Sequence, residues 1–158
     1  MKMLSLIATN KSSNRINHVN LFTDGGCRGN PGPGAIGVIL CSHENNVLHR
    51  FSECIGQTTN NRAEYNAIIR GLELCAKYTR RKVTCYSDSE LVVKQLNGVF
   101  RLKNDALRKL FLEVERLKAM FDDVTFQHTR KNNQRVKEAD KLLNQAFEGR
   151  PIDKQGNQ

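Results

Sequence analysis

Four acidic residues stand in local patterns that place a side chain at the end of an element or on a face that should turn inward. They are Asp24, Glu64, Asp88 and Asp140. Carboxylates that met without a cation would repel one another, and hard oxygen donors suit magnesium or manganese far better than zinc. In a basic protein, such a set predicts divalent-metal chemistry on the phosphodiester bonds of a nucleic acid.

The first two acids each have a plain local alternative. Asp24 precedes Gly25 and Gly26, and an aspartate before two glycines also fits an ordinary turn. Asn61 and Glu64 have the spacing of a capping box, in which the glutamate reaches back to the first amide of a helix. For Glu64 the two interpretations, helix cap and metal ligand, carry equal weight.

The other two acids are also open to a structural interpretation. Asp88 lies at an expected helix N-terminus, where the helix dipole favours a negative charge. Ser87 and Glu90 have capping-box spacing, which would assign the cap to Glu90 and leave Asp88 free. Asp140 shares the inner stripe of the last expected helix with apolar residues such as Val136, so it needs a cation, a donor or water.

Alternating and helical periodicities predict the elements that must position these acids. Strands are expected at about 19–23, 35–42 and 47–55, then a helix over 61–78, a strand over 82–86, helices near 91–98 and 107–121, a strand over 124–128 and a helix over 136–147. This order predicts an α/β fold with a mixed five-stranded sheet, in which three antiparallel strands lead into βαβ crossovers flanked by helices. We expect one domain over residues 18–149, between a flexible arm at 1–17 and a flexible tail at 150–158.

The composition limits the class of protein. The 158 residues include 25 basic and 16 acidic ones, and the resulting net charge of +9 attracts polyanions. The five cysteines form no C-x-x-C pair, which favours reduced thiols over a disulfide framework or a zinc site. No apolar run is long enough to span a membrane, and the apolar patch near the start is too short for a signal peptide, so we expect a cytoplasmic protein.

At these acids the chain resembles the type 1 ribonucleases H. The resemblance is carried by Thr23–Gly34 (TDGGCRGNPGPG), Thr58–Glu64 (TTNNRAE), Ser87–Ser89 (SDS) and the stretch from Asn133 to Asn144 around the last acid. Successive acids are separated by 40, 24 and 52 residues, in the order of the family. The resemblance covers about residues 18–148, and the ordered set is far more specific than any single motif.

The resemblance implies a ribonuclease H-like fold and an endonuclease that cuts the RNA strand of an RNA–DNA hybrid to 5′-phosphate and 3′-hydroxyl ends. The four acids would be both the catalytic residues and the ligands of two Mg²⁺ ions, for which Mn²⁺ is a possible substitute, and Asp24 would bridge the two. The resemblance implies no obligate protein partner and no membrane, and we expect a monomer.

Further family positions imply how the hybrid is recognised. The matches are Asn30, Asn60 and Asn61 for the minor groove, Thr59 and Asn104 for a phosphate of the DNA strand, and Gly25 for close approach to a ribose 2′-hydroxyl. The structural alternative for Asn60, Asn61 and Asn104 is helix capping, and one residue can serve both purposes.

Two departures from the family concern substrate handling. Many members carry a histidine on the loop before the last acid, whereas residues 129–139 hold none and Arg130 occupies that region. Many also have a basic helical protrusion, for which the link at about 98–103 is too short. Cations that could replace it are Arg28, Arg62, Lys94, Arg101, Lys103, Arg130, Lys131 and Arg135.

Two other functions fit the same residues. One is a different nuclease of the same superfold, such as a domain detached from a reverse transcriptase or a junction resolvase. The other is a non-catalytic nucleic-acid-binding module, although loss of an acid would mark such a module and all four are present.

Overall fold

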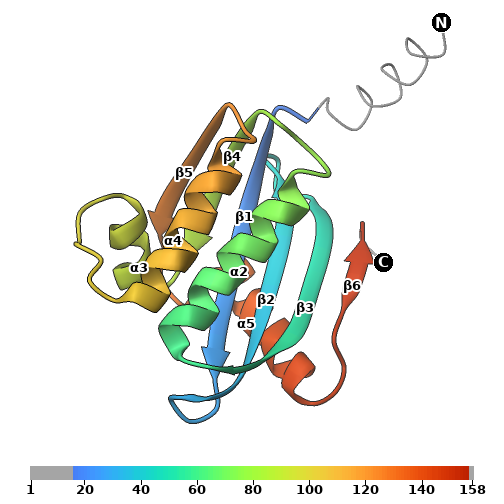
Figure 1. Cartoon of the computed structure of the whole chain (residues 1–158). Coiled ribbons are helices and arrows are strands. Elements are labelled where there is room, and N and C mark those ends of the chain that lie inside the picture. Colours follow the sequence, from blue (N-terminus) through green and yellow to red (C-terminus); the bar gives the residue numbers. More distant parts are fainter. Residues whose placement is uncertain (1–15, 157–158) are drawn as a thin grey trace, which may run out of the picture.

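The computed structural model describes residues 16–156, and in this range the chain forms one mixed sheet of order β5-β4-β1-β2-β3-β6 (Figure 1). The strands are β1 (His18–Cys27), β2 (Gly32–Ser42), β3 (Val47–Thr58), β4 (Lys82–Ser87), β5 (Asp123–His128) and β6 (Asp153–Gln155). The helices are α2 (Asn60–Cys75), α3 (Glu90–Leu96), α4 (Asp105–Lys118) and α5 (Gln134–Phe147). The expected mixed α/β architecture is therefore confirmed.

Strand β1 lies at the centre of the sheet, because it pairs antiparallel with β2 and parallel with β4. β2 and β3 continue the antiparallel meander, and β5 pairs parallel with β4. Parallel neighbours need a crossover, which α2 supplies between β3 and β4 and the α3–α4 pair supplies between β4 and β5. The predicted order of three antiparallel strands followed by crossovers is correct.

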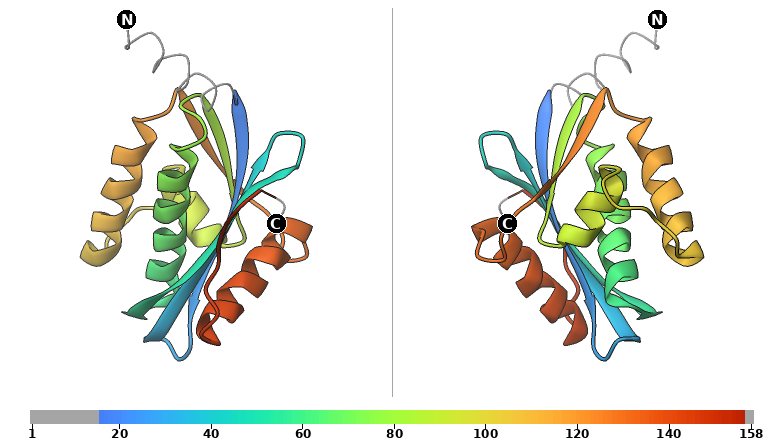
Figure 2. Two further views of the ribbon diagram at one scale, coloured as in Figure 1. Left: turned by 90° about the vertical axis from the view of Figure 1, so that its right-hand side faces the viewer. Right: turned by 90° about the vertical axis from the view of Figure 1, so that its left-hand side faces the viewer.

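Helices cover both faces of this sheet (Figure 2). α2, α3 and α4 lie on one face, where Leu21 of β1 packs among buried residues that include Tyr65 and Leu72 of α2. α5 lies on the opposite face, where Phe22 of β1 packs in a cluster with Val136. The alternation of β1 side chains between the two faces explains why consecutive residues of this strand serve different cores.

The sheet has six strands, so the predicted count of five is wrong. β6 pairs antiparallel with β3 through residues 49–51 and 153–155. His49 Nε2 lies 2.6 Å from Asp153 Oδ1, and the Ser52 amide donates to the Ile152 carbonyl at 2.8 Å. The tail that we expected to be flexible from residue 150 is thus tied to the sheet over its last described residues. A strand this short shows no periodicity in sequence, and its partner lies about a hundred residues earlier.

Most of the arm that we expected at 1–17 lies outside the described residues. Its last two residues are bonded to the domain, because the Lys82 amide donates to the Asn17 carbonyl at 3.1 Å and the Thr79 hydroxyl donates to the Ile16 carbonyl at 2.5 Å. Residues 16 and 17 are therefore tied to the domain, just before the predicted boundary at residue 18.

Within residues 16–156, no helix combines the length and apolar character that crossing a membrane requires.

Candidate active site

The site forms where β4 stops and β1 continues. The parallel pairing of these strands ends at Thr23 and Ser87, while β1 stays paired with β2 as far as Cys27. Asp88 follows Ser87 directly, so the chain leaves the sheet beside Asp24. One side of β1 is uncovered from this point, and side chains from the neighbouring helices can reach its backbone.

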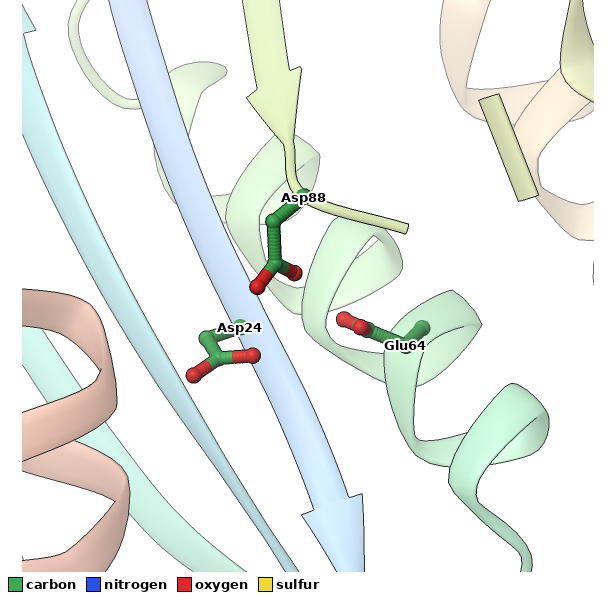
Figure 3. A group of neighbouring side chains, drawn as sticks. All are labelled: Asp24, Glu64 and Asp88. Carbon is green, nitrogen blue, oxygen red and sulfur yellow. The ribbon is translucent and has the colours of Figure 1, made fainter. Parts of the chain in front are cut away.

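Three carboxylates converge at this position. Asp24 from β1, Glu64 from α2 and Asp88 from the turn after β4 each offer an oxygen, and these three atoms lie within 4.8 Å of one another. Figure 3 shows the three side chains pointing toward a common centre. Residues far apart in sequence thus form one candidate site for a cation.

Glu64 does not cap its helix. The N-cap of α2 is Thr59, whose side chain accepts from the Arg62 amide at 3.3 Å. The Glu64 carboxylate instead accepts from the Gly25 amide at 2.9 Å, on the side of β1 that β4 leaves uncovered. The capping-box alternative for Glu64 is therefore wrong, because the N-cap is Thr59, two residues before Asn61, and the Glu64 carboxylate is bonded to Gly25.

Glu90 does not cap either. The N-cap of α3 is Ser89, whose hydroxyl accepts from the Val92 amide at 3.3 Å. Glu90 forms an ion pair with Lys94 at 3.0 Å on the helix surface. Asp88 is left free, as the sequence predicted, although Ser89 rather than Glu90 caps the helix.

The fourth acid lies across the site on α5. Asp140 is exposed and lines a hollow of about 590 Å³ together with Asp24, Glu64 and Asp88. Asp140 is therefore exposed and not buried within the apolar stripe, but it faces the same hollow as the other three acids. Its Oδ2 lies 3.4 Å from the Asn144 side-chain nitrogen.

Burial and mutual repulsion govern the charge of the site. Burial, followed by the charges of Asp88 and Asp140, raises the pKa of Asp24 to about 8. Burial likewise raises the pKa of Glu64 well above its usual range, and Asp24 and Asp88 add to this effect. A divalent cation would offset this repulsion, and an all-oxygen donor set suits a hard ion.

Two cations also line this hollow. Lys131, on the turn before α5, was named among the cations that could attract the hybrid, whereas Lys137, one turn before Asp140 on that helix, was not among the predicted residues. The Lys131 charge opposes the rise in the pKa of Glu64. For Lys137 the sequence offered only its proximity to the last acid as a signal. Arg130, which we had singled out, is exposed and is not among the residues that line this hollow.

A second hollow, of about 630 Å³, brings together most of the residues matched to hybrid recognition. Its lining includes Asn30, Thr59, Asn60, Asn61 and Asn104. The Asn60 side-chain oxygen accepts from the Cys27 amide at 3.0 Å, and the Asn60 amide donates to the Asn30 side-chain oxygen at 3.1 Å. These bonds join the loop after β1 to the start of α2. Asn60 also lines the first hollow, so the two are adjacent.

The capping alternative holds for one of the three asparagines. Asn104 is the N-cap of α4, and its side-chain oxygen accepts from the Leu107 amide at 3.0 Å. Asn60 and Asn61 lie inside α2, because Thr59 caps that helix. The side-chain amides of Asn60 and Asn61 therefore do not cap the helix.

Gly25 is required by packing. A Cβ at this position would lie 2.2 Å from the backbone oxygen of Ala63, so only glycine lets β1 lie this close to the start of α2. Gly25 also lines the first hollow. Packing against α2 thus accounts for glycine at this position, and the expected close approach to a ribose stays a prediction.

Residues 22–146 match the profile of a protein family described as Reverse transcriptase-like. A ribonuclease HI from Halobacterium salinarum is 37% identical over 131 residues, which are 82% of this chain and 64% of that relative. A bifunctional protein from Mycobacterium tuberculosis is 34% identical over 131 residues, which are 35% of its length. The chain thus spans less than two thirds of these curated relatives.

Solved structures agree with the sequence comparison. The RNase H1 of Halobacterium salinarum superposes with a TM-score of 0.79 at 35% identity, covering 84% of this chain and 98% of the other. An RNase H1 from compost, solved in complex with an RNA/DNA hybrid, superposes with a TM-score of 0.78 at 37% identity, covering 83% of this chain and 97% of the other.

Proposed function

Because the chain belongs to the ribonuclease HI family, we propose that it is a metal-dependent endonuclease that hydrolyses the RNA strand of RNA–DNA hybrids to 5′-phosphate and 3′-hydroxyl products. The observation that carries this proposal is the convergence of Asp24, Glu64 and Asp88 within 4.8 Å, with Asp140 on the same hollow. Four acids grouped on one hollow of a basic protein would repel a polyanion such as a nucleic acid. A module that only binds nucleic acid would therefore have no use for them.

We propose Mg²⁺ as the natural ion, with Mn²⁺ as a substitute, and two ions held by the four acids. The all-carboxylate donor set and the raised pKa values of Asp24 and Glu64 support a divalent cation at this position. When bound, the ions would supply a hydroxide from water and stabilise the leaving 3′ oxygen. The Gly25 amide orients the Glu64 carboxylate. Lys131 and Lys137 line the hollow, where their ammonium groups can contact a phosphate.

The adjacent second hollow supports a hybrid as the substrate. Asn60 and Asn61 have side-chain amides free of helix capping, and such groups can both donate to and accept from base edges and 2′-hydroxyls in a minor groove. Thr59 and Asn104 line the same hollow and can contact a backbone phosphate. Gly25 would bring backbone close to the ribose. Arg130 lies on the turn before α5, and we assign it only general attraction to the substrate.

We also propose that the enzyme acts in the cytoplasm, as a monomer and without an obligate protein partner. All five cysteines are free thiols in the structure, which suits a reducing compartment. Sedimentation of the purified protein would test the monomer, and a dimer at micromolar concentration would contradict it.

The decisive experiment incubates the protein with end-labelled RNA–DNA hybrid, double-stranded RNA and double-stranded DNA. We expect cleavage of the RNA strand of the hybrid with Mg²⁺ or Mn²⁺, and none with Ca²⁺ or with excess chelator. Asp24→Asn should abolish cleavage and keep binding. The matched control is Asp122→Asn, because Asp122 is an exposed acid whose partner is Arg81.

Three outcomes would contradict the proposal. Full activity in excess chelator would exclude the metal site, cleavage of DNA junctions in preference to hybrid would favour another nuclease of the superfold, and binding without cleavage by the native protein would favour a non-catalytic module. Salt should also weaken hybrid binding steeply, because several phosphates are neutralised.

A further inference from the structure

A buried hydrogen bond joins α2 to α3, close in sequence to two of the converging carboxylates. The Tyr65 hydroxyl donates to the Gln95 side-chain oxygen at 2.7 Å, and neither residue lines the first hollow. We propose that Tyr65 and Gln95 are positioning residues, whose bond fixes where Asp88 lies relative to Glu64. The inference rests on the proposed function and deepens it, because it assigns the geometry of the metal site to a pair of residues outside that site.

The surroundings of this bond are apolar. Tyr65 is 0% exposed and Gln95 is 8% exposed, and Tyr65 packs in a buried cluster with residues such as Ile68 and Val92. Burial raises the pKa of Tyr65, so its hydroxyl keeps its proton and acts as the donor. A phenol buried without a partner is unfavourable. Because a hydrogen bond holds over a narrow range of distances, whereas apolar contacts are non-directional, the bond specifies one separation between the two helices.

On α2 the bond begins one residue after a ligand of the proposed metal site. Glu64 accepts from the Gly25 amide at 2.9 Å, which ties the helix to β1. Consecutive residues of a helix point about 100° apart, so Tyr65 is directed away from the Glu64 side chain and toward α3. One residue thus ties α2 to β1, and the next ties it to α3.

On α3 the bond ends in a helix that continues directly from the turn carrying Asp88. Ser89 follows Asp88 and caps α3, and Figure 3 shows Asp88 where the chain leaves β4. α3 has seven residues, a length that forms no stable helix alone, so its contacts with the rest of the domain decide where it lies. Gln95 supplies a directional contact of this kind. A shift of α3 against α2 would therefore move Asp88 against Glu64.

The identity of the ion determines how strongly the site responds to such a shift. The three converging oxygens lie within 4.8 Å of one another, a spacing at which they can share a cation. Mg²⁺ requires nearly octahedral geometry with bonds of about 2.0–2.1 Å, whereas Ca²⁺ accepts longer bonds and irregular geometry. Displacing Asp88 should therefore weaken Mg²⁺ binding far more than Ca²⁺ binding. A loss of stability that left the site intact would not change the ratio of the two affinities.

The test measures Mg²⁺ and Ca²⁺ binding to the metal-free protein by calorimetry. We expect Tyr65→Phe and Gln95→Met each to lower the Mg²⁺ affinity about ten-fold and the Ca²⁺ affinity less than about two-fold. In cleavage assays at limiting Mg²⁺, both variants should lower kcat and leave KM for the hybrid unchanged, since neither side chain lies in the second hollow.

Tyr78→Phe is the matched control. It also removes a phenol hydroxyl bonded to a buried side chain, His49 Nδ1 at 2.8 Å, but beyond the far end of α2. We expect Tyr78→Phe and Tyr65→Phe each to lower the thermal midpoint by about 2–4 °C, as for the loss of one hydrogen bond. Tyr78→Phe should leave both metal affinities unchanged.

The double variant Tyr65→Phe with Gln95→Met separates positioning from stability. Removing both polar partners should return the thermal midpoint toward the native value, while the Mg²⁺ affinity stays low because no directional bond sets the helix separation. Equal losses of Mg²⁺ and Ca²⁺ affinity, or recovery of Mg²⁺ affinity together with the thermal midpoint, would overturn the proposal. If the native protein shows this dependence on Tyr65 and Gln95 but does not cleave hybrid, the positioning assignment stands and the catalytic proposal fails.

Discussion

The Glu64 carboxylate accepts a hydrogen bond from the backbone amide of Gly25 at 2.9 Å, across 39 positions of sequence. This bond is possible because β4 ends at Ser87 and leaves the Gly25 amide without a strand partner. It places Glu64 beside Asp24 and gives the buried Glu64 carboxylate a hydrogen-bond donor. The first turn of α2 and the end of β1 are thereby fixed to each other at the centre of the site.

Gly25→Ala should destabilise the protein and weaken the site. The added Cβ would lie 2.2 Å from the Ala63 carbonyl oxygen, a backbone atom that cannot move without shifting α2. We expect a loss of about 1–3 kcal/mol in the free energy of unfolding, measured by urea denaturation, and a lower affinity for Mg²⁺ measured by calorimetry.

Gly26→Ala is the matched control for this substitution. Its Cβ would meet no heavy atom closer than the Asn60 side-chain oxygen at 3.7 Å, an ordinary contact. If both variants were equally unstable, the packing of β1 against α2 would not be the reason for glycine at position 25.

Asp24→Asn should stabilise the metal-free protein at neutral pH. The unfolded Asp24 releases its proton near 3.8, whereas the folded residue retains it up to about 8. Between these values the folded state binds more protons, so the free energy of unfolding of the native protein falls as pH rises. We expect the variant to gain about 1–3 kcal/mol at pH 8 and nothing below pH 4, measured by thermal unfolding in chelator.

Added Mg²⁺ should reverse this order, because a ligand of the folded state stabilises it and the native site binds the ion better. A variant that is less stable than the native protein at pH 8 in chelator would contradict the buried, mutually repelling site.

Arg135→Ala should loosen α5 and with it Asp140. The Arg135 guanidinium bonds the Asn45 side-chain oxygen at 3.2 Å, the Asn45 carbonyl at 2.8 Å and the Glu138 carboxylate at 2.5 Å. These bonds fasten the first turn of α5 to the β2–β3 turn. We expect a loss of about 1–3 kcal/mol in stability and a several-fold rise in the Mg²⁺ concentration for half-maximal cleavage.

Arg150→Ala is the control, because Arg150 is also near α5 but pairs with the exposed Glu148. Arg135→Lys should restore part of the stability and not the full set of bonds, since lysine lacks the planar fork. An unchanged Mg²⁺ dependence in Arg135→Ala would show that α5 is positioned by its apolar face alone.

Asp153→Asn should release the last strand without unfolding the domain. His49 is buried and bonds Asp153 at 2.6 Å, but the Asp153 side chain is 69% exposed, so solvent weakens the pair. We expect a loss of about 0.5–1 kcal/mol and faster hydrogen exchange at the Ser52 amide, which donates to Ile152. Asp122→Asn, in the exposed pair with Arg81, should change neither quantity.

Local patterns were sufficient for the order of the elements, and they indicated the four acids as candidates. Alternation along β1 and helical spacing along α5 are properties of neighbouring residues, and they appear in the structure with only the ends shifted. The Asn104 cap was also predictable, because a cap and its amide lie three residues apart.

Contacts between residues far apart in the sequence could not be predicted from such local patterns. Glu64 and Asn61 have capping-box spacing, but the start of α2 at Asn60 and the early end of β4 turned Glu64 toward Gly25 instead. β6 pairs with residues 49–51 of β3, and no pattern near Asp153 in the sequence indicates this partner.

The sequence by itself therefore determined which residues carry oxygen donors, in which order, and on which kinds of element. Only the tertiary structure decided that three of these donors meet within 4.8 Å, that Asp140 stays exposed beside them, and that the chain closes with a sixth strand. The physical reason is that local periodicity records which face of an element is buried, whereas the partner of a polar group depends on where neighbouring strands end and which backbone amides they leave unpaired.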